Sequence, residues 1–363
     1  MTSVIQEDFA LCICTFRRTE FLKRLLQDML HQTMLPGVLI IVDGDPSSDS
    51  VSSLLKEIQF PEQMKKWWLP SNHANLPYQR YLGWLALQNE RLSYFIYLDD
   101  DLRIKRPETL SRIIEPLTRE DGNVVGVTTE LVHGLPADDQ ANALTMTSVQ
   151  PVGDSLFVKW FGAARNIQPG GLSPSGHRRM PISNSAGISE VNWLTGGVMA
   201  YAFKAMFRHC FSEDLFAVYE VKSGKGEDTL LSRRVGASGK MYYLFGDHFE
   251  HPGGVLPVAY STHPFQYGFA LAYSRRMLND DYRPYRSPLF SDRVALVKSY
   301  FGTAMLNWWR ALKRPGLRQF QLAAGYSLGA LKGLAQRPSA RTLTPHIDWQ
   351  ADAAAALSKR VAV

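Results

Sequence analysis

Cysteine is scarce in this sequence of 363 residues, which contains only Cys12, Cys14 and Cys210 and no Cys-x-x-Cys pair. This excludes a disulfide-stapled scaffold and a cysteine-ligated zinc module, and it favours a reducing cytoplasm. No uninterrupted apolar run reaches the ~18 residues that a membrane-spanning helix needs. A basic segment followed by an apolar core is also missing from Met1–Asp8, so no secretory signal is expected.

Compositional bias is absent as well. The 27 glycines and 20 prolines follow no repeat, and 45% of the residues are hydrophobic while 20% are charged. Collagen-like, low-complexity and disordered chains are therefore excluded. The length suits one large globular domain or two of ordinary size.

Positive charge is concentrated late in the chain. Residues 275–341 contain thirteen Lys or Arg and three Asp, a net charge of +10, so the rest of the +6 chain sums to −4. Nucleic acid, an anionic membrane or a phosphate-bearing lipid would each suit such a segment. Trp308 and Trp309 beside Arg310, Lys313 and Arg314 fit a helix in a membrane interface, or a core-docked helix with a solvated basic face.

Strand-like and helix-like segments alternate along the first part of the chain. Apolar runs predict buried strands, and apolar residues at helical spacing predict helices, with a helix over 19–34 stopped by Pro36-Gly37. This alternation is typical of a parallel sheet with helices on both faces, where ligands bind at the carboxyl ends of the strands. The predicted strands are 9–16, 38–42, 64–69, 94–98, 124–129 and 240–245; further helices are predicted at 78–89, from 107, near 204, near 228 and over 291–335.

Three carboxylates, Asp99, Asp100 and Asp101, directly follow the apolar strand predicted at 94–98. Their burial without a cation would be costly. In an extended segment Asp99 and Asp101 project to one side and can share a ligand. Oxygen ligands suit Mg²⁺ or Mn²⁺, which often arrive with phosphates. A solvated acidic loop is the alternative interpretation.

A second acidic pair, Glu227 and Asp228, stands behind the glycines of 224–226 where a helix is predicted to begin. Asp228 fits an N-cap that accepts free backbone N–H groups. It fits equally well a general base carried into an active site by a flexible segment. The residues alone do not separate these two roles.

The order of these motifs resembles the pattern of glycosyltransferase family 2 over about residues 9–255. The resemblance implies a GT-A fold of the α/β class, with a Rossmann-like, mostly parallel sheet flanked by helices and a C-terminal helical extension. We expect a nucleotide-sugar-binding half at 1–130, an acceptor-binding and catalytic half of the same domain at 131–255, and a basic helical extension at 256–363. The matching segments are 14–18, 40–43, 75–83, 98–101, 196–197 and 226–228.

The resemblance also implies an activity: inverting transfer of a sugar from a nucleoside-diphosphate sugar to an acceptor hydroxyl, assisted by Mg²⁺ or Mn²⁺, in cell-surface polysaccharide synthesis. Of the two histidines that can complete a metal site, His251 is preferred over His248 because His-Pro-Gly-Gly begins a turn, although a structural role suits either. The implied residues are Asp228 as base with Glu227 beside it; Thr15, Arg18, Asp43, Arg80, Asp99 and Asp100 on the donor; and Asp101, Asp99 and His251 at the metal.

The sequence departs from the commonest motif of the family after the second predicted strand, where Asp43-Gly44-Asp45-Pro46 replaces Asp-Asp-Gly-Ser.

Three rival functions remain: a sugar nucleotidyltransferase, although its N-terminal glycine loop is missing; a nucleic-acid-binding protein; and a nucleotide-sugar-binding protein without catalysis. The expected partners are the donor, a saccharide or lipid-linked saccharide acceptor, and an anionic membrane surface, with no nucleic acid. The expected location is cytoplasmic, including the inner face of the cell membrane. Trp160 and Trp193 suit core packing better than stacking on an acceptor sugar.

Overall fold

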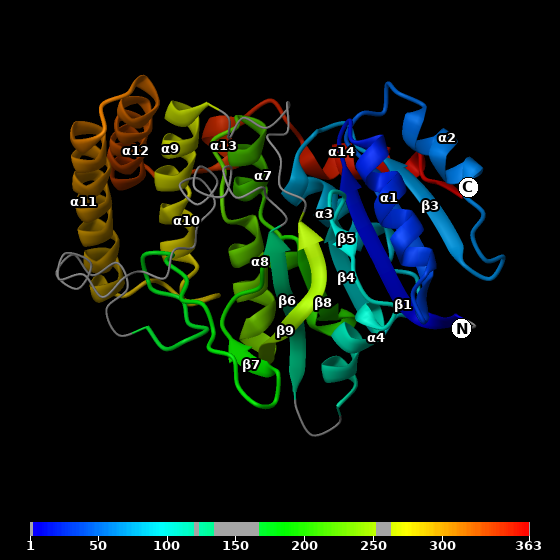
Figure 1. Cartoon of the computed structure of the whole chain (residues 1–363). Coiled ribbons are helices and arrows are strands. Elements are labelled where there is room, and N and C mark those ends of the chain that lie inside the picture. The colour runs from blue at the N-terminus through cyan, green and yellow to red at the C-terminus, as the bar shows by residue number, and fades with distance from the viewer. Residues whose placement is uncertain (1–2, 120–122, 134–166, 252–262, 363) are drawn as a thin grey trace.

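Four parallel strands form one half of the central sheet in the computed structural model, which describes residues 3–119, 123–133, 167–251 and 263–362. Their order is β3-β2-β1-β4, and their carboxyl ends lie at the upper edge in Figure 1. Because both faces are covered, the strands are rich in buried apolar residues. Their bounds are β1 (Val4–Thr15), β2 (Met34–Asp43), β3 (Lys65–Pro70) and β4 (Tyr94–Asp99).

The other half of the sheet is mixed. β8 (Val198–Ala202) runs antiparallel to β4 and joins it to β6 (Val124–His133), which pairs in parallel with β9 (Lys240–His251). Short antiparallel strands complete the edges: β5 (Arg103–Ile104) and β7 (Ile188–Val191) on β9, and β10 (Val361–Ala362) on β3.

Helices cover both faces of the sheet (Figure 1). Alternate residues of β1 point to opposite sides, so that Leu11 joins one apolar core and Cys12 the other. Helices α1 (Thr19–Leu30), α2 (Ser50–Glu57) and α4 (Thr109–Ile114) pack on the Leu11 side. On the Cys12 side lie α3 (Leu76–Ala86), α7 (Glu213–Glu220), α8 (Glu227–Val235) and α14 (Trp349–Ser358). The predicted class, α/β with a mostly parallel sheet flanked by helices, is confirmed.

The predicted C-terminal helical region is also present and lies beside the sheet in Figure 1. The helix predicted over 291–335 is two helices, because Pro315 and Gly316 interrupt it. No helix among the described residues is long and apolar enough to cross a membrane. The bounds are α9 (Pro264–Tyr273), α10 (Arg275–Asp280), α11 (Phe290–Lys313), α12 (Leu317–Ala335) and α13 (Ala340–Leu343).

Two local predictions were wrong. Helix α1 ends at Leu30, and Pro36-Gly37 lies inside β2, where the pairing with β1 shifts register between Gln6 and Ala10. The helix predicted near Lys204 is a single 3₁₀ turn, because the backbone becomes extended at Met206. The 3₁₀ turns are η1 (Glu115–Thr118), η2 (Phe203–Ala205), η3 (Arg208–Cys210) and η4 (Gly236–Ser238).

Candidate active site

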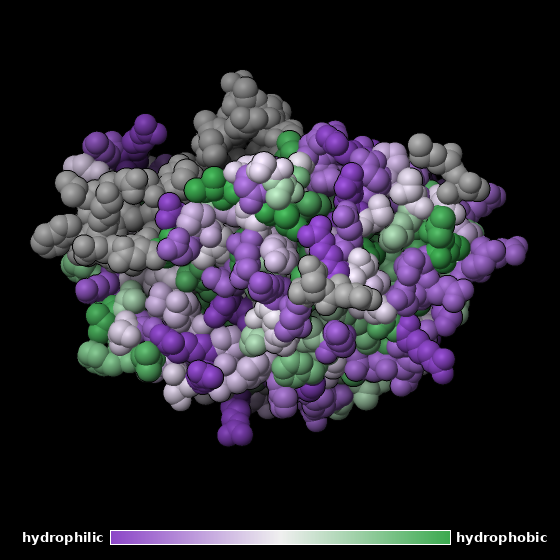
Figure 2. Space-filling model, turned by 90° about the horizontal axis from the view of Figure 1, so that it is seen from below, coloured by the Kyte–Doolittle hydropathy of each residue, from purple (hydrophilic) through white to green (hydrophobic). Residues whose placement is uncertain are grey.

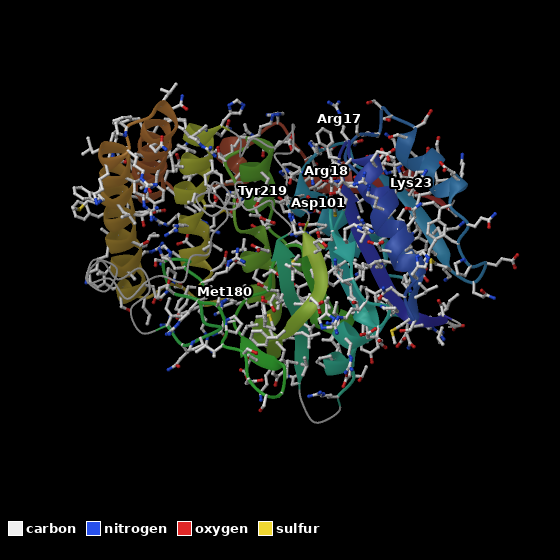
Figure 3. The ribbon with its side chains drawn as sticks, viewed as in Figure 1. Arg17, Arg18, Lys23, Asp101, Met180 and Tyr219 are labelled. Atoms are coloured by element: carbon white, nitrogen blue, oxygen red, sulfur yellow. The ribbon has the colours of Figure 1, made fainter. Side chains whose placement is uncertain are left out.

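The carboxyl ends of three neighbouring strands bring predicted site residues together. Thr15 lies opposite Asp43 in the β1–β2 register, and Cys14 of β1 lies opposite Asp99 of β4. Figure 3 shows Arg18 and Asp101 side by side above these strand ends. Parallel strands therefore place the donor-side candidates at one edge of the sheet, as the sequence predicts.

The acidic triplet divides after its first member. Asp99 is the last residue of β4, while Asp100 and Asp101 form a turn, so the expected alternation of side chains stops at Asp99. The Thr15 hydroxyl donates to Asp100 Oδ2 at 2.6 Å. Arg18 Nη1 lies 3.0 Å from Asp100 Oδ1 and 3.2 Å from Asp101 Oδ2, and so links the second and third acids.

Asp43 is almost fully buried at the end of β2. Its Oδ1 accepts the Asp45 backbone N–H at 2.9 Å, and its Oδ2 accepts Trp68 Nε1–H at 3.3 Å. Burial raises the pKa of Asp43 in spite of these hydrogen bonds. The side chain predicted to contact the nucleotide base thus also holds the turn that begins at Gly44.

Arg80 joins the two acidic clusters. It is 2% exposed on helix α3, and its Nη2 donates to Asp99 Oδ1 at 3.0 Å and to the Gly196 carbonyl at 2.9 Å. Its Nη1 donates to Glu227 Oε1 at 3.3 Å. Burial opposes the charge, but the surrounding carboxylates prevail and raise the pKa of Arg80, which stays a cation. One guanidinium thereby fixes β4 and the start of α8 around a common point.

Helix α8 begins at Glu227, after the N-cap Gly226 whose φ of +84° suits glycine, and it carries Glu227 and Asp228 in its first turn. Asp228 is therefore not the N-cap, although its Oδ1 accepts the Thr229 N–H at 2.7 Å. Its Oδ2 accepts the Gly196 N–H at 3.0 Å. The N-cap interpretation is therefore wrong, and the general-base role stays a prediction for a side chain that faces the cluster around Arg80.

Arg178 holds Asp228 in a two-point ion pair that the sequence does not predict. Its Nη1 lies 2.9 Å from Asp228 Oδ2 and its Nη2 lies 3.2 Å from Oδ1. The guanidinium rests over the Trp193 ring at 5.1 Å, a cation–π contact. Trp193 itself is fully buried and donates to the Gly171 carbonyl, which confirms its predicted packing role. Trp160 lies outside the described residues.

Glu227, the neighbour of Asp228, has partners on both oxygens. Arg80 donates to Oε1, and the Tyr219 hydroxyl donates to Oε2 through a short hydrogen bond. Tyr219 projects toward the site from α7, across from Arg18 and Asp101 in Figure 3. Glu227 is therefore held in place by the protein, which suits support of the site better than proton transfer.

The two clusters differ in their electrostatics. Burial raises the pKa of Asp99 to about 7, although Arg80 opposes the shift, and it raises the pKa of Asp100 to about 6 against the effect of Arg18. Asp228 is buried too, but Arg178 and the Thr229 N–H outweigh burial and lower its pKa. The five acids of both clusters face three guanidinium groups, those of Arg18, Arg80 and Arg178, which leaves a formal charge of −2 at the site.

The residues at the Asp101 end fit a divalent cation. Asp101 is 7% exposed, and its Oδ1 has no hydrogen-bond partner among the described residues. His251 Nε2, at the end of β9, lies 3.5 Å from that oxygen. His248 is buried away from the triplet, where burial and the nearby Arg106 lower its pKa. The described residues include no preformed group of three ligands, but Mg²⁺ often binds through one or two carboxylates, substrate phosphates and water.

A cavity of about 310 Å³ adjoins Asp101. Phe21 and Arg24 line it from α1, and Glu250 lines it from β9. It provides space and a positive side chain beside the carboxylate that would hold a cation.

Sequence reasoning missed two contributors to the site, Arg178 and Tyr219, and it singled out Gly196 as part of the matching segment 196–197. Arg178 and Gly196 lie in connections without periodicity, and Tyr219 looks like any partly buried aromatic residue of a helix. A signal existed only for Gly196, in the pair Gly196-Gly197, which permits close approach of the backbone.

Comparisons with known proteins agree with the resemblance seen in the sequence. Residues 10–141 match the family model of glycosyl transferase family 2. A search of curated proteins finds no match.

Several solved structures are similar at low identity. The mannosyltransferase PcManGT from Pyrobaculum calidifontis, in complex with GDP-Man and Mn²⁺, is 12% identical with a TM-score of 0.47, over 90% of this chain and 87% of that one. TarS residues 1–349 from S. aureus are 10% identical with a TM-score of 0.43, over 90% and 91% of the two chains. A mycobacterial protein is 13% identical with a TM-score of 0.38, over 74% and 73%.

Proposed function

We propose, from the match of residues 10–141 to the family model of glycosyl transferase family 2, that the chain is an inverting, metal-dependent transferase. It moves a sugar from a nucleoside-diphosphate donor to an acceptor hydroxyl. The observation that carries the proposal is Arg80, which contacts Asp99 and Glu227 at once and so draws together two acidic clusters more than 120 positions apart in the chain.

The donor side is assigned to the ends of β1, β2 and β4. We assign Asp43 to the nucleotide base and Thr15 to the lining of the same pocket, as the resemblance implies, and Arg18 would supply positive charge beside them. Asp101 and His251 would hold Mg²⁺ or Mn²⁺, with Asp99 close by. When bound, such an ion stabilises the negative charge that builds on the diphosphate leaving group. The charge of −2 at the site supports this assignment, since a divalent cation would neutralise it.

Asp228 is assigned as the base that takes the proton of the acceptor hydroxyl during attack on the anomeric carbon. In the described structure its two oxygens accept five hydrogen bonds: two from Arg178, one from the Gly196 N–H, and two from the N–H and hydroxyl of Thr229. A carboxylate so occupied has no lone pair left for the acceptor. We therefore infer that Arg178 withdraws when the acceptor binds, while the two backbone N–H groups keep Asp228 oriented. A single displacement of this kind inverts the anomeric carbon.

The remaining parts of the proposal concern the biological setting. We propose a saccharide or lipid-linked saccharide acceptor, a role in cell-surface polysaccharide synthesis and a cytoplasmic location. The cation would bind together with the nucleoside-diphosphate sugar, because the protein itself offers few ligands for it.

The experiment is donor hydrolysis and transfer with UDP-, GDP- and dTDP-sugars, with Mn²⁺ or Mg²⁺ and with chelator. We expect turnover with one donor class only when metal is present. Asp228→Asn should lower turnover by about 10²–10⁴-fold and leave nucleotide binding nearly unchanged, because it removes only the base. The matched control is Glu57→Gln, which changes an exposed carboxylate of α2 that pairs with Lys23. Wild-type turnover in Asp228→Asn would refute the assignment.

A further inference from the structure

The helical hairpin α11–α12 presents an apolar face to solvent. Both helices carry large apolar side chains, between 43% and 76% exposed, on the sides that do not pack against the protein. Figure 2 shows hydrophobic residues gathered at the left edge of the molecule, where these helices lie in Figure 1. Such a patch on a folded protein marks an interaction surface. Representative members are Met305, Trp309, Leu312, Leu317, Leu328 and Leu331.

This exposure does not arise from a loosely attached hairpin. Helix α12 lies so close to α9 that a Cβ atom at Gly325 would come within 2.0 Å of the Phe265 carbonyl oxygen. Across the hairpin, Trp308 Nε1–H donates to Ser327 Oγ at 3.1 Å, and Tyr300 of α11 donates to the Ala272 carbonyl at 2.9 Å. The inner faces are tightly packed, so the outer apolar face is displayed on a fixed support.

The charge around this face has one sign. Between residues 293 and 347 the chain contains nine Lys or Arg and no Asp or Glu. Arg293 and Arg337 pair with Asp280 outside the hairpin. Arg310, Lys313 and Arg314 are exposed at the turn between the helices, among Trp309, Leu312 and Leu317. We call residues 308–318 the hairpin tip.

We propose that the hairpin tip and the adjoining outer face of α11 and α12 bind an anionic lipid membrane. Apolar and indole side chains enter the headgroup and acyl boundary, while lysine and arginine pair with lipid phosphates. A second copy of the chain is a poorer occupant, because a two-fold contact would set the cations of one tip against those of the other. Nucleic acid is a poorer occupant too, because surfaces that bind it are polar and positively charged and would leave the exposed leucine and methionine side chains without apolar contacts.

The orientation of the tip matters for the site. In Figure 1 the connection between α11 and α12 lies at the top, the same side as the carboxyl ends of β1 and β4. A membrane against the tip therefore lies on the side where the acceptor would approach. This last step rests on the proposed function; lipid binding by the tip does not.

The test is flotation of the full chain with vesicles of phosphatidylcholine alone or mixed with phosphatidylglycerol, at low and high salt. We expect flotation only with the anionic vesicles and a decrease at high salt. Arg310→Gln with Arg314→Gln should weaken binding by about tenfold or more, since each cation near an anionic surface contributes roughly fivefold. Trp309→Ser with Leu317→Ser should weaken binding comparably.

Matched controls remove the same groups elsewhere. Lys56→Gln with Arg91→Gln deletes two exposed cations at the sheet end of the molecule, and Ile182→Ser deletes an exposed apolar side chain. Both should float like wild type, and all variants should keep donor hydrolysis, so that loss of membrane binding and loss of the proposed reaction are read separately.

Three outcomes would overturn the proposal: no preference for anionic vesicles, equal losses in the control variants, or tip variants that instead abolish a dimer in sedimentation or the binding of a duplex nucleic acid.

Discussion

Two acidic clusters lie on either side of Arg80, the first formed by Asp99, Asp100 and Asp101 and the second by Glu227 and Asp228, yet the pKa values of their aspartates shift in opposite directions. Asp99 and Asp100 are buried with too little positive charge around them, and their pKa values rise to about 7 and about 6. Asp228, whose side chain is only 10% exposed, makes a two-point contact with Arg178 that lowers its pKa. The most deeply buried carboxylate does not have the highest pKa, so the carboxylates differ because of their partners. Arg178 therefore stabilises the charged form of the second cluster, whereas under the proposed function a divalent cation would add the positive charge that the first cluster needs.

The sharpest way to break this comparison is to remove the residue that both clusters share. Arg80→Met would leave Asp99 and Glu227 buried without their cation, which typically costs about 3–5 kcal/mol in the free energy of unfolding. Urea unfolding measures this loss. Arg80→Lys, which keeps the charge but not the fork of donors, should recover part of it.

The control for that variant is Arg103→Met, which breaks an ion pair with Asp28 whose arginine side chain is 46% exposed. An exposed pair of this kind contributes about 1 kcal/mol or less. If Arg80→Met cost no more than Arg103→Met, Arg80 would not join the clusters in solution.

The sequence predicts the first cluster much better than the second. Apolar runs identify β1, β2 and β4, and parallel strands bring their carboxyl ends to one edge, so Thr15, Asp43 and Asp99 follow from pattern and topology together. Only the alternating arrangement predicted for Asp99 to Asp101 was wrong, because β4 ends at Asp99 and residues 100 and 101 form a turn.

The second cluster depends on contacts that no local pattern encodes. Arg178 lies 50 positions before Asp228, in an irregular segment that tertiary packing positions. For the same reason, composition indicates the basic helical extension, but not its return to the sheet through Trp349 of α14 and the short strand β10. Long-range pairing of this kind is where periodicity carries no information.

Removing the cation that pairs with Asp228 tests the comparison at the second cluster. Arg178→Gln keeps hydrogen-bond donors but not the charge, so the pKa of Asp228 should rise and the acid limb of the kcat/KM profile should move up by about one pH unit. Turnover on the alkaline side should stay within about tenfold of wild type, because Gly196 and Thr229 still orient the carboxylate. Arg178→Lys keeps the positive charge, so the acid limb of this variant should lie close to its wild-type position. If neither substitution moved the acid limb of the kcat/KM profile, then Asp228 would not be the base, or Arg178 would not contact it in solution.

The smallest expected effect is the pH dependence of the free energy of unfolding that titration of Asp99 in the first cluster causes. Asp99 has a pKa of about 7 in the folded protein against an ordinary value of 3.8, so between these values the folded state binds more protons than the unfolded state. Stability of the metal-free protein should therefore fall as pH rises through this window. Asp99→Asn removes the titration and should reduce the total loss of stability across this window by roughly 1–2 kcal/mol, allowing for a side chain that is 30% exposed. Urea unfolding in chelator measures both curves, with the exposed Asp247→Asn as control. Parallel curves for wild type and Asp99→Asn would show that the first cluster is not short of positive charge, and the contrast with Asp228 would disappear.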